Sequence, residues 1–139
     1  PKTPKPRRSS NSNYNMQVRC ATSFDERFNP NEVLNARDPS SFWMTTGLYP
    51  QELLIKIPKR RLTNVKFSTN GARKVVIEGC RDPNAQTFSK IGESKEMPQR
   101  GGAQSESIQI SEAGDVEYIK FIVKDGWEEF TSVHSVEFS

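Results

Sequence analysis

Short runs of alternating apolar and polar residues cover most of the chain after residue 53, and they predict β-strands. The strongest run spans 116–124, where apolar side chains recur at nearly every second position. A largely apolar run at 53–57 ends at Pro58, and a run at 62–69 ends at Asn70-Gly71, a dipeptide typical of hairpin turns. The predicted strands are 14–21, 53–57, 62–69, 74–80, 88–91, 105–110, 116–124 and 132–138.

One short segment favours a helix. Asn29 suits an N-cap, Pro30 suits the first helical position, and Glu32 lies three residues after the cap. Asp38-Pro39 ends this helix after one or two turns. Eight or nine short strands, one brief helix and no βαβ spacing predict an all-β fold, an antiparallel β-sandwich or jelly roll.

Residues 41–52 follow neither the helical nor the strand period. Gly47 permits positive φ and Pro50 lacks a backbone donor, so we expect a shaped loop here. A loop this rich in apolar side chains either packs under the domain or contacts a partner. We predict that Phe42 and Trp43 fill the interior of the sandwich, whereas Leu48, Tyr49 and the step Gln51-Glu52 face outward.

The basic charge of the chain is concentrated at its beginning. The 139 residues carry a formal charge of +3, but residues 1–13 hold four basic residues and no acidic one. The remainder is therefore close to neutral, which argues against nucleic-acid binding. We expect a disordered basic leader at 1–13 and one jelly-roll domain at 14–139. No apolar run is long enough to span a membrane, so no membrane insertion is expected.

No pattern in the sequence indicates an enzyme. His134 is the only histidine, and no cysteine or carboxylate cluster lies near it in sequence, which favours a structural role. No nucleophile elbow or phosphate-binding loop is present. Cys20 and Cys80 lack metal-type spacing; we expect two reduced, buried thiols, with a disulfide between them as the alternative.

One cluster of oxygen-bearing side chains follows the predicted helix. Asn35, Asp38 and Ser41 lie close together in sequence, as ligands of Ca²⁺ do in tight loops. The alternative is a turn in which these groups bond to local backbone amides, and spacing alone favours that turn.

Three segments carry a resemblance to a known family. A helix turn, an oxygen-rich loop, Ser-Phe-Trp and a strand together resemble the discoidin, or galactose-binding-like, superfamily. More specifically, ATSFDE at 21–26, FWMTTGLYPQE at 42–52 and SVHSV at 132–136 resemble the intraflagellar transport protein 25 family over residues 20–138.

The resemblance implies an eight-stranded jelly roll without enzymatic activity. It implies a heterodimer with a Rab-like small GTPase of the intraflagellar transport protein 27 type. The pair would join the other subunits of the intraflagellar transport B complex, in the cilium or flagellum and in the cytoplasm near the basal body.

The family's calcium site falls on the helix-to-strand loop, so the resemblance implies Ca²⁺ ligands at Asn35, Asp38 and Ser41. A carbonyl near His134 or Ser135 would complete the site. Asn35 is uncharged and lies one residue further from Ser41 than the family pattern has it, so we expect a dissociation constant of ~10⁻⁴ M or weaker.

Partner contacts are expected at four positions: Leu48, Tyr49, Gln51 and Trp127. The alternative function is a calcium-dependent carbohydrate- or lipid-binding module, which would use protruding aromatic side chains or the pair Arg37 and Arg73. A chaperone is a third and weaker alternative.

Overall fold

The protein is described from a computed structural model, in which residues 16–23, 30–34, 42–45, 48–82, 84–99, 101–110 and 114–139 are placed. The expected basic leader at 1–13, the N-cap Asn29 and the predicted helix end at Asp38-Pro39 lie outside these residues. The division into leader and domain therefore stays a prediction.

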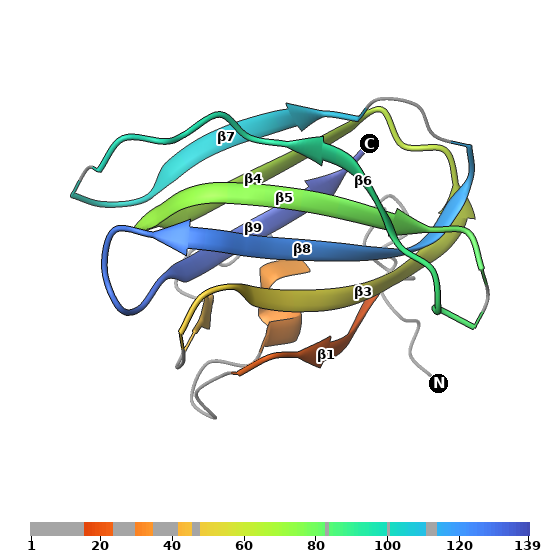
Figure 1. Ribbon diagram of the computed structural model, residues 1–139, viewed down its shortest axis with the longest axis horizontal. Coiled ribbons are helices and arrows are strands. Elements are labelled where there is room, and N and C mark those ends of the chain that lie inside the picture. Colours follow the sequence, from red (N-terminus) through yellow and green to blue (C-terminus); the bar gives the residue numbers. More distant parts are fainter. Residues whose placement is uncertain are drawn as a thin grey trace, which may run out of the picture.

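The described residues form two antiparallel sheets packed face to face (Figure 1). In chain order the elements are β1 (Gln17–Ala21), the 3₁₀ helix η2 (Pro30–Leu34), β2 (Trp43–Met44), β3 (Gln51–Arg60), β4 (Asn64–Asn70), β5 (Ala72–Cys80), β6 (Ser89–Glu93), β7 (Gln104–Gln109), β8 (Val116–Gly126) and β9 (Ser132–Phe138). One sheet has the order β1-β3-β8-β5-β6 and the other β2-β9-β4-β7. The predicted all-β sandwich is confirmed.

The core lies between the two sheets and follows from the alternation along the strands. On β3 the side chains of Leu53, Ile55 and Ile57 are fully buried. Phe67 of β4 and Phe121 of β8 meet across the core edge to face, with ring centroids 5.4 Å apart. The sequence pattern thus fixes which face of each strand points inward.

The helix η2 closes one side of the sandwich. It contacts β1, β2 and β9, and so fills the space between the edge strands of the two sheets. Val33 of η2 and Trp43 of β2 are both fully buried there. Trp43 also donates its indole N–H to the Ser23 carbonyl at 2.7 Å, so the predicted core role of this tryptophan is confirmed.

The prediction that Pro58 ends the third strand is wrong. β3 continues to Arg60, and its register with β8 shifts between Lys56 and Arg60. Three residues of β3, 57–59, face the single residue Glu117 of β8 over this step, because Lys56 pairs with Tyr118 and Arg60 pairs with Val116. Such an irregularity accommodates a proline, which has no N–H to give to the sheet.

The hairpin predicted at Asn70-Gly71 is also wrong, although the turn itself is present. Gly71 has a φ of +93°, as the dipeptide predicts. However, β4 pairs with β7 and β9, whereas β5 pairs with β6 and β8. The turn therefore carries the chain from one sheet to the other.

The two cysteines differ in environment. Both are free thiols, and Cys80 is buried as expected. The expectation of burial is wrong for Cys20, which is exposed because it lies on the edge strand β1. No disulfide joins them.

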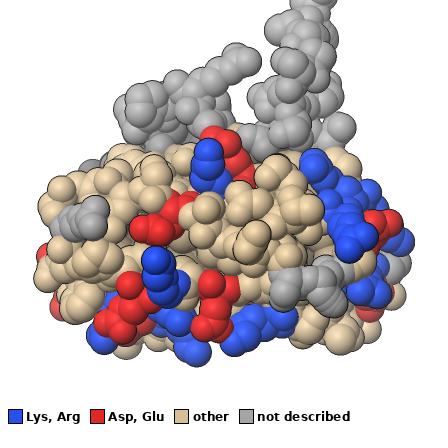
Figure 2. Space-filling model, turned by 90° about the horizontal axis from the view of Figure 1, so that it is seen from above, with Lys and Arg blue, Asp and Glu red and all other residues tan. Residues whose placement is uncertain are grey.

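Charged side chains of both signs are interspersed over much of the face that Figure 2 shows, and basic side chains gather at its right-hand end. Oppositely charged side chains also pair directly, as Lys56 does with Glu117 at 3.0 Å. In the described part of the chain no helix is long and apolar enough to cross a membrane.

Candidate partner-binding surface

Two connections meet at one end of the sandwich and expose apolar side chains. Residues 48–50 link β2 to β3, and residues 127–131 link β8 to β9. Leu48 is 84% exposed, Phe130 52% and Trp127 36%. We call the surface formed by Leu48, Tyr49, Trp127, Glu128 and Phe130 the end surface. Exposed aromatic and aliphatic side chains grouped in this way are typical of protein interfaces.

Tyr49 joins the two connections of the end surface. Its hydroxyl donates to the Glu128 carbonyl at 2.7 Å and lies 2.5 Å from Oγ1 of the buried Thr131. A Cβ at Gly126 would lie 2.2 Å from the Tyr49 hydroxyl oxygen, so only glycine fits beneath the ring. Tyr49 thus ties the loops together, in addition to the partner contact predicted for it.

Burial raises the pKa of Tyr49. The hydrogen bond with Thr131 opposes this rise, and the charges of Asp125 and Glu128 add to it. The phenol therefore stays protonated well above neutral pH and remains a hydrogen-bond donor.

Gln51 does not face outward, contrary to the prediction. Its side chain is 3% exposed, its Nε2 donates to the Leu48 carbonyl, and its Oε1 accepts from Ser23 Oγ. It lies on the same face of β3 as Leu53, so the strand alternation directs it inward. It supports the loop that presents Leu48.

Two contacts fix the indole ring of Trp127, a hydrogen bond at its N–H and a cation–π contact over its face. Its Nε1 donates to the Met97 carbonyl at 3.0 Å, and the Arg73 guanidinium lies 4.7 Å from its ring centroid. Arg73 is in turn paired with Glu96 at 2.7 Å and with Asp125 at 3.6 Å. Because these contacts occupy Arg73, it is poorly placed for the carbohydrate role considered above; Arg37 lies outside the described residues.

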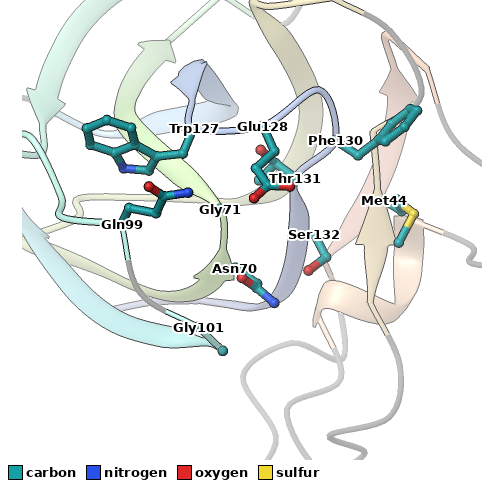
Figure 3. A pocket seen from close by; sticks show the side chains of 11 residues that line it. Met44, Asn70, Gly71, Gln99, Gly101, Trp127, Glu128, Phe130, Thr131 and Ser132 are labelled. Carbon is teal, nitrogen blue, oxygen red and sulfur yellow. The ribbon is translucent and has the colours of Figure 1, made fainter.

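A groove of about 340 Å³ lies beside the end surface. Figure 3 shows Trp127 and Gln99 on one side of it and Phe130 and Met44 on the other. Its described lining residues are Met44, Asn70, Gly71, Gln99, Gly101, Gly102, Trp127, Glu128, Phe130, Thr131 and Ser132. Sequence reasoning missed this groove because four separate segments form it, and only the glycines of two turns hinted at such a site.

The predicted calcium ligands are only partly visible. Asn35, Asp38 and Ser41 lie outside the described residues, whereas Ser135 lies half-buried in β9 opposite Ser68. The described residues contain no group of three His, Cys, Asp or Glu side chains placed to hold a metal.

The described residues on either side of 35–41 contact β9. The helix η2, which precedes this segment, contacts β9. Phe42, which follows it, packs on His134 with ring centroids 5.0 Å apart.

His134 of β9 has two neighbours among the described residues. Its Nε2 lies 3.0 Å from Ser132 Oγ, and Phe42 covers its ring. Burial lowers the pKa of His134, so the imidazole is neutral at physiological pH.

Comparison with known proteins decides the family. No protein-family model matches the chain. "Intraflagellar transport protein 25" of Chlamydomonas reinhardtii is 33% identical over 121 residues, which make up 86% of this chain and 62% of that protein. The homolog of Homo sapiens is 30% identical over 126 residues, or 90% of this chain and 86% of that protein.

The chain belongs to the intraflagellar transport protein 25 family.

Membership of the intraflagellar transport protein 25 family connects the chain with intraflagellar transport, and so with the cilium or flagellum. The chain spans about three fifths of the algal protein's length.

Solved structures confirm the galactose-binding-like jelly roll. The family 32 carbohydrate-binding module of Clostridium perfringens NanJ, solved with galactose, superposes with a TM-score of 0.74 at 15% identity and covers 92% of this chain and 96% of that one. Reduced XRCC1 bound to the DNA polymerase β catalytic domain gives a TM-score of 0.74 at 10% identity and covers 88% and 93%. At these identities the likeness shows the fold alone.

Proposed function

We propose that this chain is a non-enzymatic adaptor subunit of the intraflagellar transport B complex that forms a heterodimer with a Rab-like small GTPase. The observation that carries the proposal is the end surface, an apolar patch on a rigid β-sandwich whose chain belongs to the intraflagellar transport protein 25 family. The pair would act with other subunits of the complex in the cilium or flagellum and around the basal body.

The end surface has the properties of a protein interface. Leu48 and Phe130 are exposed, yet Tyr49 and Gln51 fix the loops that present them. A preformed apolar surface binds with a smaller loss of conformational entropy than a flexible one. A stable interface buries ~1,600 Å² in total, so neighbouring strands must also contribute.

The contacts of His134 support a non-enzymatic role. In the described part of the chain its contacts are with Ser132 and Phe42, and none of the described carboxylates pairs with it as the orienting partner of a hydrolytic triad would. The proposed work of the chain is therefore binding.

Weak calcium binding is part of the proposal. Asn35, Asp38 and Ser41 would supply side-chain oxygens, and Ser135 or its neighbour would supply a carbonyl. The contacts that η2 and Phe42, which flank residues 35–41 in sequence, make with β9 support this set. Bound calcium would hold the segment against β9 and so stabilise the fold.

A calcium titration tests this site. We expect the melting temperature to rise at millimolar Ca²⁺ in the unaltered chain and to stay constant in Asp38→Ala. Mg²⁺ at the same concentration is the control. No shift with Ca²⁺ in the unaltered chain would refute the site.

Co-purification with the Rab-like GTPase of the same organism tests the heterodimer. Phe130→Ser removes an exposed aromatic side chain from the end surface and should weaken the complex. Phe88→Ser is the matched control, because the Phe88 ring lies under Lys120 on the outer face of the β1-β3-β8-β5-β6 sheet. A complex that Phe130→Ser and Leu48→Ser leave intact would remove the end surface from the interface.

The carbohydrate- or lipid-binding alternative has one observation in its favour, the groove between Trp127 and Phe130 with carboxamides at Asn70 and Gln99. Aromatic rings and carboxamides together suit a sugar. A glycan array and liposome flotation test this alternative, which predicts calcium-dependent binding.

A further inference from the structure

We infer that the groove receives a lysine or arginine side chain of the partner, while apolar partner residues lie on Leu48 and Phe130. This inference rests on the function proposed above, since the partner is the GTPase subunit. It adds the chemistry of the contact: a basic residue flanked by apolar ones.

The charge of the groove is the first argument. Glu128 is the only charged residue among the described residues that line it. The segment from 125 to 132 contains Asp125, Glu128 and Glu129 and no basic residue. The described lining therefore carries one negative charge and no positive one, which favours a cation as the group that enters beside Glu128.

The nearby Arg73 does not supply that cation. Its guanidinium is held by Glu96 at 2.7 Å and by Asp125 at 3.6 Å, and it lies over the ring of Trp127. Two carboxylates share this one positive charge. None of the described basic residues pairs with the carboxylate of Glu128, so this carboxylate is available to a cation of the partner.

The walls of the groove suit the shape of a basic side chain. Met44, Phe130 and Trp127 offer apolar surface along which the methylene stem of lysine or arginine packs. Asn70 and Ser132 offer oxygens that accept hydrogen bonds beside Glu128. Basic side chains at interfaces are recognised in this way, by apolar surface along the methylene stem and by acceptors at the charged group.

The groove is already formed in the unbound chain. The Trp127 amide donates to the Gly71 carbonyl at 2.9 Å, and the Trp127 indole donates to the Met97 carbonyl. The Tyr49 hydroxyl donates to the Glu128 carbonyl. The Tyr49 bond uses the main-chain oxygen of Glu128, so the side chain of Glu128 is replaceable without breaking it.

The test measures the dissociation constant of the complex between the full chain and the Rab-like GTPase at low and high salt. Glu128→Lys should weaken binding about tenfold or more, because it replaces a charge-assisted contact by repulsion. Glu128→Gln should weaken it less and flatten its salt dependence. Glu137→Lys and Glu137→Gln are matched controls, since Glu137 is an exposed acid near the other end of β9. The dissociation constants of these two control variants should stay within about twofold of that of the unaltered chain.

The outcomes separate the inference from the proposed function. A complex that forms but is indifferent to Glu128→Lys overturns the inference and leaves the heterodimer standing. An unaltered chain that forms no complex at all overturns the proposed function, and the inference falls with it. Displacement of the GTPase by free galactose would identify the groove as a sugar site and would also overturn the inference.

Discussion

Removal of one oxygen atom, in Tyr49→Phe, tests whether the two connections of the end surface are held together as the structure shows. The hydroxyl of Tyr49 donates to the Glu128 carbonyl at 2.7 Å and lies 2.5 Å from Thr131 Oγ1. Phenylalanine keeps the ring and its packing, so the substitution removes only these two bonds. The change therefore isolates the polar part of the contact.

The expected cost follows from the two lost bonds. A neutral hydrogen bond contributes ~1 kcal/mol net, and the hydroxyl of Thr131, a residue only 1% exposed, is left without its partner. We therefore expect the free energy of unfolding to fall by about 2 kcal/mol. For a domain of this size the melting temperature should fall by roughly 6–10 °C.

Urea unfolding followed by tryptophan fluorescence measures this loss, because one of the two tryptophans, Trp127, lies in the connection that Tyr49 holds. Combining Tyr49→Phe with Thr131→Val gives a double-mutant cycle, and we expect a coupling energy of about 1 kcal/mol. A loss below about 0.5 kcal/mol for Tyr49→Phe, the usual size for surface substitutions, would refute the reasoning.

Three further predictions follow from the same structure. Gly126→Ala should lower the free energy of unfolding by about 2 kcal/mol, because the new Cβ would lie 2.2 Å from the Tyr49 hydroxyl; an unchanged urea midpoint would contradict this. Burial lowers the pKa of His134 below its unfolded value, so stability is retained above about pH 6.5 and is lost as pH falls below it. His134→Gln should lose less stability than the unaltered chain between about pH 7 and pH 5, and parallel losses would contradict this. Exposed Cys20 should react rapidly with a thiol reagent in the folded chain and buried Cys80 only after unfolding; two equally fast thiols would contradict the burial.

The sequence predicts the strands well where alternation is strong. The run at 132–138 coincides with β9, and the burial of Leu53, Ile55 and Ile57 follows from their spacing. These features depend on local side-chain direction, which the period of two determines.

The choice of strand partners depends on more than local sequence. Asn70-Gly71 sets the geometry of a turn but not the sheet that the next strand joins. A turn between two sheets therefore has the same sequence signal as a hairpin turn within one sheet. Pro58 likewise indicates a missing donor, and only the pairing with β8 shows that a bulge accommodates it.

The end surface was predicted in part. Leu48 and Trp127 are exposed as a partner contact requires, whereas Gln51 is buried. The linking role of Tyr49 depends on residues 79 and 82 positions away in sequence, beyond the reach of any local pattern. The groove between Trp127 and Phe130 is unpredictable from sequence for the same reason.

The central claim is that this member of the intraflagellar transport protein 25 family is the partner of a Rab-like small GTPase. Its most direct test is the mass of the co-expressed and co-purified proteins in solution, measured by light scattering during size-exclusion chromatography. We expect a single species with one copy of each chain, which Glu128→Lys weakens and Glu137→Lys does not. Separate elution of the two unaltered chains at micromolar concentration would contradict it.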